Sequence, residues 1–202
     1  MTSARLYPDL LLRSLDATWN RARWEQLPDD GCRYEVIAGV LYRSTVPTPL
    51  HQWVVRQAAR LLIEQICEPG IGVVLWSPIG LFMPGCDPVQ PDLLVVRAAD
   101  QGIVRERGIE GVPALLVEVL SPSNPEHDLV VKRACYARVG VPEYWIIRPT
   151  ERDILVHHQP EPASGQYTQI SRIAPEEELV SPTLPFRVPV AAFFADAPGT
   201  SS

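Results

Sequence analysis

The chain has 202 residues, of which 46% are hydrophobic and 21% charged, a composition typical of a globular domain with one sizeable core. Its net charge of -6 argues against a broadly basic coat for nucleic acid, but not against a local basic patch or a metal that bridges acidic groups to phosphates. No apolar run approaches the roughly 20 residues of a membrane helix. The first residues also lack a signal-peptide pattern. We therefore expect no membrane segment and a cytoplasmic location.

The four cysteines are far apart in the sequence and form neither a CxxC pair nor a Cys/His cluster; they are Cys32, Cys67, Cys86 and Cys135. Disulfides are rare in the reducing cytoplasm, and zinc sites need clustered ligands. We therefore predict four buried thiols, with neither disulfides nor zinc ligands.

The N-terminal part of the chain predicts small elements around one long helix. Residues 18–27 are expected to form a short helix that packs its tryptophans onto the body. Residues 33–37 and 39–43 predict a hairpin, because two strand-like runs flank a tight glycine turn. Residues 50–67 have the apolar spacing of a helix, and His51 falls in its first turn.

The middle of the chain alternates apolar strands with one helix. The apolar run at 89–96 contains Pro91-Asp92 near its start, which places a carboxylate at a strand entry. Residues 98–112 predict a charged, mobile loop. A strand at 113–120, a helix at 125–139 and a strand at 141–147 form a crossover whose length predicts parallel neighbours. Further short strands are predicted at 72–76, 79–83, 153–158 and 167–173, and the segments 184–188 and 189–194 are expected to close the domain.

We divide the chain into an N-terminal helical extension at 1–30, one domain at 31–196 and a disordered tail at 197–202. The tail is assigned from its composition of small and polar residues. No internal repeat was found.

Three ionisable residues stand where packing alone would not place them. Glu118 interrupts an apolar strand, and burying an ionised carboxylate costs several kcal/mol unless a cation, a metal or hydrogen bonds compensate. Asp92 lies on the preceding long apolar strand. On the following helix Lys132 shares a face with Asp128 and Tyr136, because these residues recur every four positions.

These residue types are the ones that a metal-dependent phosphodiesterase needs. Asp92 and Glu118 could hold a hard cation such as Mg²⁺, which polarises a phosphate and activates water. Lys132 could orient that water or neutralise developing charge. We expect its ammonium to lie within a water's span of Glu118, roughly 3 to 6 Å.

Simpler interpretations compete with each of these roles. A lone acidic residue at a strand end is more often a cap or a surface group, and a histidine at a helix start is more often a surface residue than a phosphate contact. For Asp128, a plain helical ion pair with Lys132 is as good an interpretation as a catalytic role. Tyr136 fits packing better than chemistry, and His127, His157 and His158 show no usable pattern.

The motifs together resemble the Uma family of restriction-type endonucleases, within the PD-(D/E)xK nuclease superfamily, over about residues 33–160. The resemblance implies an α/β fold, more closely α+β, with a restriction-endonuclease-like core whose mixed sheet is flanked by helices. It also implies Mg²⁺-dependent phosphodiester hydrolysis, with Mn²⁺ as a substitute and DNA as the substrate. It rests on Pro91-Asp92, on EVLSPS from Glu118, on Asp128 with Lys132 and Tyr136, and on GVPEYW from Gly140.

The resemblance carries roles over to particular residues. Asp92 and Glu118 become the metal ligands, Glu35 a further acidic member of the site, and His51 a phosphate contact or proton shuttle. The superfamily motif has a lysine two residues after the glutamate, where this chain has Leu120. Lys132 therefore has to supply that cation from the helix.

Two functions stay open from the sequence. The first is a Mg²⁺-dependent endonuclease acting on DNA, which the joint presence of Asp92, Glu118 and Lys132 favours. The second is a non-catalytic relative that keeps the fold to bind nucleic acid or a protein partner. A homodimer would suit the cutting of two strands, but no residue pattern identifies an interface.

Overall fold

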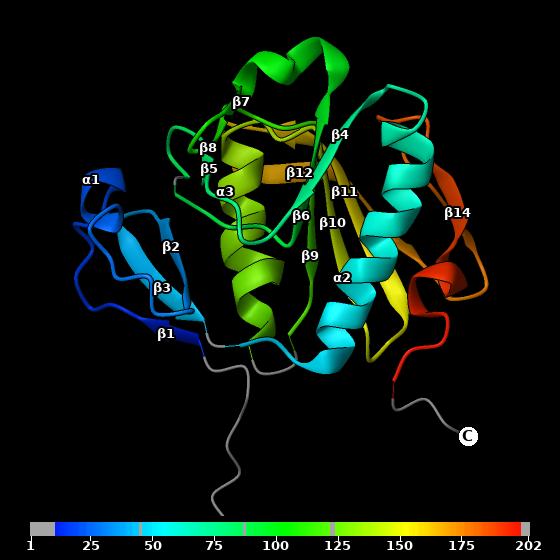
Figure 1. Ribbon diagram of the computed structural model, residues 1–202, viewed down its shortest axis with the longest axis horizontal. Coiled ribbons are helices and arrows are strands. Elements are labelled where there is room, and N and C mark those ends of the chain that lie inside the picture. The colour runs from blue at the N-terminus through cyan, green and yellow to red at the C-terminus, as the bar shows by residue number, and fades with distance from the viewer. Residues whose placement is uncertain (1–10, 45, 87, 122–123, 199–202) are drawn as a thin grey trace, which may run out of the picture.

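The computed structural model describes residues 11–44, 46–86, 88–121 and 124–198, and it is organised around a six-stranded sheet (Figure 1). The strand order is β12-β11-β10-β9-β6-β4. The pair β9 and β10 is parallel and the other neighbours are antiparallel, so the prediction of a mixed sheet is confirmed. The strands are β4 (Gly72–Trp76), β6 (Leu93–Arg97), β9 (Leu115–Val119), β10 (Glu143–Arg148), β11 (Asp153–Glu161) and β12 (Gln166–Ile173).

The parallel pair is joined by a helical crossover, as predicted. A π-helical segment, His127–Lys132, continues into α3 (Arg133–Arg138). Gly140 then turns the chain back, because its φ of 79° lies in the left-handed region where a glycine carries no steric penalty. The backbone N–H of Val141 donates to the Tyr136 carbonyl at 3.0 Å, which satisfies one of the last helical acceptors.

One face of the sheet is covered by α2 (Pro49–Leu62), which a π-helical segment, Ile63–Cys67, extends. Thr48 caps α2 by accepting from the His51 N–H at 3.2 Å, and Pro49 occupies the first turn. None of the described helices is long and apolar enough to cross a membrane. The same face is covered by the C-terminal elements β13 (Glu178–Val180), β14 (Arg187–Pro189) and a 3₁₀ helix, Val190–Phe194.

The other face carries α3 and a small sheet from the N-terminal part of the chain (Figure 1). In this sheet β1 (Leu11–Arg13) pairs with β3 (Val40–Ser44), which forms the predicted hairpin with β2 (Arg33–Ile37). Ala38 and Gly39 both have positive φ, 51° and 77°. The glycine is required there, since a Cβ would lie 2.2 Å from the Ala17 carbonyl oxygen. The tight turn therefore fixes the register of the hairpin.

Two predicted segments differ from the structure. The helix expected at 18–27 is reduced to α1 (Arg21–Trp24), which Asn20 caps. The loop expected at 98–112 is instead ordered by a fully buried Ile109, around which three short elements form. They are a 3₁₀ helix, Ala98–Ile103, then β7 (Val104–Arg105) and β8 (Gly108–Glu110), and β8 also pairs with β5 (Leu81–Phe82).

The predicted domain division stays a prediction, although the N-terminal extension contains the strand β1 as well as α1. Of the predicted disordered tail at 197–202, residues 199–202 lie outside the described residues.

The prediction of four thiols is wrong for one pair of cysteines. Cys86 and Cys135 form a disulfide, with their Cα atoms 5.5 Å apart, and both residues are buried. The bond ties the loop after β5 to α3, the helix that follows Lys132. Its partners are separated by 49 residues, and no local spacing reveals such a pair. Cys32 and Cys67 are free.

Replacing both paired cysteines, as Cys86→Ala with Cys135→Ala, should lower the free energy of unfolding by about 2 to 4 kcal/mol, because the crosslink restricts the unfolded chain. Urea unfolding with and without reductant measures the effect. Reductant should destabilise the original protein and a Cys32→Ala control, and leave the double variant unchanged. If reductant does not alter the original protein, the two sulfurs are not joined in solution.

Candidate active site

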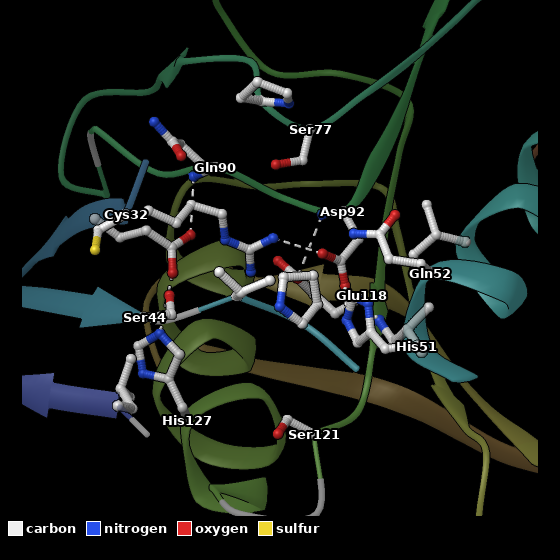
Figure 2. A pocket seen from close by; sticks show the side chains of 18 of the residues that line it. Cys32, Ser44, His51, Gln52, Ser77, Gln90, Asp92, Glu118, Ser121 and His127 are labelled. Atoms are coloured by element: carbon white, nitrogen blue, oxygen red, sulfur yellow. Dashed lines mark hydrogen bonds and ion pairs between the residues drawn. The ribbon is translucent and has the colours of Figure 1, made fainter. Parts of the chain in front are cut away.

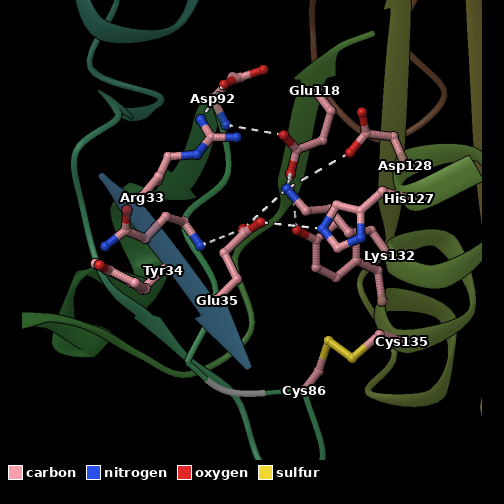
Figure 3. A network of polar contacts seen from close by, with 12 residues as sticks. Arg33, Tyr34, Glu35, Cys86, Asp92, Glu118, His127, Asp128, Lys132 and Cys135 are labelled. Carbon is pink, nitrogen blue, oxygen red and sulfur yellow. Dashed lines mark hydrogen bonds and ion pairs between the residues drawn. A yellow bond between two sulfur atoms is a disulfide. The ribbon is translucent and has the colours of Figure 1, made fainter. Parts of the chain in front are cut away.

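Four buried carboxylates from different parts of the fold gather near the end of β9 (Figure 3). Glu35 comes from β2, Asp92 from the entry to β6, Glu118 from β9 and Asp128 from the π-helical segment. The Asp92 N–H donates to Glu118 Oε2 at 3.4 Å, and the Val119 N–H donates to Asp92 Oδ2 at 2.8 Å. The structure therefore brings the two predicted metal ligands together on adjacent strands.

Lys132 lies among these carboxylates and is completely buried. Its Nζ is 2.8 Å from Glu118 Oε1, 3.0 Å from Glu35 Oε1 and 3.7 Å from Asp128 Oδ1. The side chain points toward the carboxylate pair as the sequence predicted. Its contact with Glu118 is direct, at 2.8 Å just below the roughly 3 to 6 Å that we expected.

The π-helical geometry explains which side chains share this face. A π-helix bonds residues five apart, so His127 and Lys132 stand one turn from each other. Both reach Glu35: His127 Nε2 lies 3.3 Å from Oε2, while Lys132 takes Oε1. A spacing of four residues, as in an α-helix, predicted Asp128 beside Lys132, and that contact is the longest of the three.

Asp92 is held by two cationic partners from other elements. Arg33 Nη1 lies 2.6 Å from Asp92 Oδ1, and His51 Nε2 lies 3.1 Å from Oδ2. The His51 side chain is only 12% exposed, so the interpretation of His51 as a surface histidine is wrong. Its role as phosphate contact or proton shuttle stays a prediction.

Sequence reasoning missed three residues of the network: Arg33, His127 and Tyr136. Arg33 had a usable signal, since it lies two residues before Glu35 on a strand and therefore projects from the same face. The Tyr136 hydroxyl donates to Glu118 Oε1 at 3.0 Å, so this residue does more than pack. His127 had no usable signal in the sequence, because only a π-helical turn aligns it with Lys132.

The electrostatics leave the network with excess negative charge. Burial raises the pKa of Glu118 to about 8, with help from Asp92 and Asp128 and against the opposing charge of Lys132. Burial alone would raise the pKa of Asp92 too, but the charges of His51 and Arg33 outweigh it and hold that pKa below its usual range. A proton or another cation near Glu118 therefore relieves the repulsion among the carboxylates.

The donor set fits a hydrated Mg²⁺ ion better than a metal enclosed by protein ligands. Among the described residues, no three His, Cys, Asp or Glu side chains form a ready metal cluster. Asp92 and Glu118 nevertheless supply hard carboxylate oxygens side by side, and within the described part of the chain Glu118 Oε2 makes a single hydrogen bond, a long one from the Asp92 N–H. Mg²⁺ is commonly held by one or two carboxylates and keeps several waters.

The carboxylates are reached from a cavity of about 380 Å³ (Figure 2). Its walls come from the hairpin, the first turns of α2, the segment after β4 and the start of the π-helical segment. Arg33, His51, Asp92 and Glu118 all line it. The buried charges thus face a space that a small group can enter.

A mixed sheet flanked by helices, with paired carboxylates at the ends of adjacent strands and a lysine on the crossover helix, is the architecture of a nuclease-type fold. This chain is similar, with a TM-score of 0.71, to the crystal structure of a protein from Anabaena variabilis that is described as a "putative nuclease belonging to DUF820". The two share 16% identity, over 86% of this chain and 96% of that one, so the likeness shows the fold.

Residues 4–191 match the model of the Uma2 family, described as "Putative restriction endonuclease", and the chain belongs to that family. The family resemblance found in the sequence is thereby confirmed. The comparison with curated proteins gave no significant match. Family membership supports a nuclease.

The raised pKa of Glu118 predicts that stability falls as pH rises. Between its ordinary value of 4.5 and about 8, the folded protein keeps a proton that the unfolded chain has released. The free energy of unfolding should drop by an amount on the order of 1 to 3 kcal/mol from pH 5 to 8.

Urea unfolding at several pH values measures this slope. Glu118→Gln should flatten it, whereas Glu64→Gln, a change in an exposed ion pair with Arg60, should leave it unchanged. A slope that is the same in all three proteins would assign the effect to other groups.

Removing the buried ammonium should cost much more stability than removing an exposed one. Lys132→Met leaves Glu35 and Glu118 without their shared cation, which should lower the free energy of unfolding by about 3 to 5 kcal/mol. Adding Glu118→Gln to this variant should recover part of the loss. The matched control Arg60→Met, on the surface, should cost no more than about 1 kcal/mol. A small loss for Lys132→Met would contradict the buried ion pair.

Proposed function

We propose that the protein is an endonuclease that hydrolyses phosphodiester bonds of DNA with Mg²⁺, for which Mn²⁺ can substitute. The observation that carries this proposal is the joint position of Asp92 and Glu118 beside the ammonium of Lys132, at the wall of a cavity. Membership of the Uma2 family supports the same reaction class. To the family membership, the proposal adds the metal ion, the DNA substrate and catalysis itself.

Asp92 and Glu118 are the residues that would hold the metal. Bound Mg²⁺ would polarise the scissile phosphate and lower the pKa of an attacking water. Lys132 and Tyr136 both donate to Glu118 Oε1, which fixes the carboxylate plane and leaves Oε2 with one weak contact. In this proposal Lys132 orients Glu118 and balances its charge.

The partners of Asp92 have two further tasks in the proposal. Arg33 is 25% exposed and lines the cavity, and a guanidinium offers several N–H donors, so it can turn from Asp92 toward a phosphate oxygen. His51 Nε2 positions Asp92, while its buried Nδ1 has no hydrogen-bond partner among the described residues. That free nitrogen suits the predicted phosphate contact or proton shuttle. Glu35 holds Lys132 and His127 in place.

Two variants separate metal binding from turnover. Glu118→Gln removes a ligand, so both Mn²⁺ affinity, measured by calorimetry, and plasmid nicking should fall. Lys132→Met keeps the ligands, so Mn²⁺ affinity should survive while the rate drops by about 10² to 10³. Asp100→Asn, an exposed change outside the cavity, should affect neither. Circular dichroism checks that each variant is folded under the assay conditions.

The outcomes distinguish the proposal from the alternative of a non-catalytic relative. A pure original protein that neither binds Mn²⁺ nor nicks plasmid would leave binding of nucleic acid or a protein partner as the function. Nicking that persists unchanged in either site variant would place the activity elsewhere. Sedimentation with and without DNA tests the homodimer, which stays a prediction.

A further inference from the structure

One aromatic side chain stands beside the carboxylates without being part of their network. Trp76 ends β4, is 51% exposed and lines the same cavity as Asp92 and Glu118. It pairs in register with Leu93, and the next N–H, that of Ser77, donates to the Asp92 carbonyl at 3.0 Å. The backbone that presents the indole is therefore tied to the backbone that presents the predicted metal ligand.

The cavity that Trp76 lines has apolar as well as charged residues. Val46, which is 71% exposed, also lines this cavity, as do Pro47 and Pro78. Strand alternation places Trp76 on the same face as Val74, which packs in the core beneath α2. A half-exposed indole in a cavity that also holds polar groups is typical of a ligand site.

The size of the cavity and the net charge of the protein restrict which ligand can lie against Trp76. A volume of about 380 Å³ is near the lower end of small-ligand cavities, which span roughly 300 to 1,000 Å³. The cavity suits a single nucleotide better than a duplex. A protein with a net charge of -6 gains little affinity from general attraction to phosphates, so contact with a base would have to contribute.

We infer that Trp76 stacks on the base of an unpaired DNA nucleotide next to the phosphate that the carboxylate site would hold. The inference rests on the proposed function and names its substrate as single-stranded or locally unpaired DNA. Stacking tolerates any base, because every base has a π-face. Gln52 and Gln90 line the same cavity with amide groups that can hydrogen-bond a base edge.

Binding without metal tests the inference independently of cleavage. A fluorescently labelled single-stranded 12-mer of roughly the length that such folds bind is titrated in EDTA by anisotropy, beside its duplex and an RNA of the same sequence. Trp76→Ala should weaken binding of the DNA single strand about five- to 150-fold. Trp76→Phe should keep most of the affinity. Ile170→Ala, an exposed apolar change on β12 outside the cavity, should keep all of it.

Intrinsic fluorescence supplies a second readout, using the unlabelled strand. Stacking should quench tryptophan emission of the original protein, and Trp76→Phe should abolish that quenching although it still binds. Equal affinity of Trp76→Ala and the original protein, quenching that survives in Trp76→Phe, or no detectable single-strand binding would each overturn the inference. Tighter binding of the duplex or of the RNA would overturn the substrate class.

The two proposals fail separately. If the original protein nicks plasmid but Trp76→Ala binds single strands normally, the stacking site falls and the nuclease stands. If Trp76-dependent binding is observed without any metal-dependent nicking, the nuclease falls and the nucleobase site stands.

Discussion

The structure of the site depends on one buried ammonium group. Lys132 has no exposed surface, and its Nζ lies between Glu118 on the central sheet and Glu35 on the hairpin. A buried charge costs several kcal/mol unless its partners are close and well oriented. The π-helical segment, β9 and β2 are therefore held in fixed relative positions. Because β2 is distant in sequence from the other two elements, this contact couples the docking of the hairpin to the geometry of the candidate site.

The balance of charges around Lys132 also bears on the metal binding that we propose. Four carboxylates gather around Lys132 and Arg33, and the pKa of Glu118 is raised first by its burial and then by repulsion from Asp92 and Asp128. In the present arrangement Arg33 and His51 neutralise Asp92 from outside the sheet. In the proposed function Asp92 and Glu118 would hold a divalent cation, which would take over that neutralisation and free the arginine for the cavity. Under that proposal the network would exchange its internal cations for an external one.

The sequence predicted the centre of this site because charged residues stand there at positions where packing calls for apolar ones. Glu118 inside an apolar strand, Asp92 at a strand entry and Lys132 on the crossover helix were all found from that conflict, and the parallel pair β9 and β10 followed from the crossover length. The features that the sequence did not predict depend on contacts that leave no regular spacing in the sequence. His127 aligns with Lys132 only in a π-helix, and Cys86 meets Cys135 across 49 residues. The segment 98–112 was predicted as a loop because long-range contacts order it, namely the burial of Ile109 and the pairing of β8 with β5.

If the proposed substrate is DNA, this acidic protein has to bind that polyanion through a local site. At physiological salt the Debye length is about 8 Å, so most surface carboxylates act weakly on a phosphate in the cavity. The charges that count are those lining it, where Arg33 and His51 face Asp92 and Glu118. Affinity that comes from stacking on Trp76 does not depend on net charge. The proposed stacking on Trp76 would therefore reconcile the net charge of -6 with a nucleic-acid substrate, and it would favour substrates whose bases are already exposed.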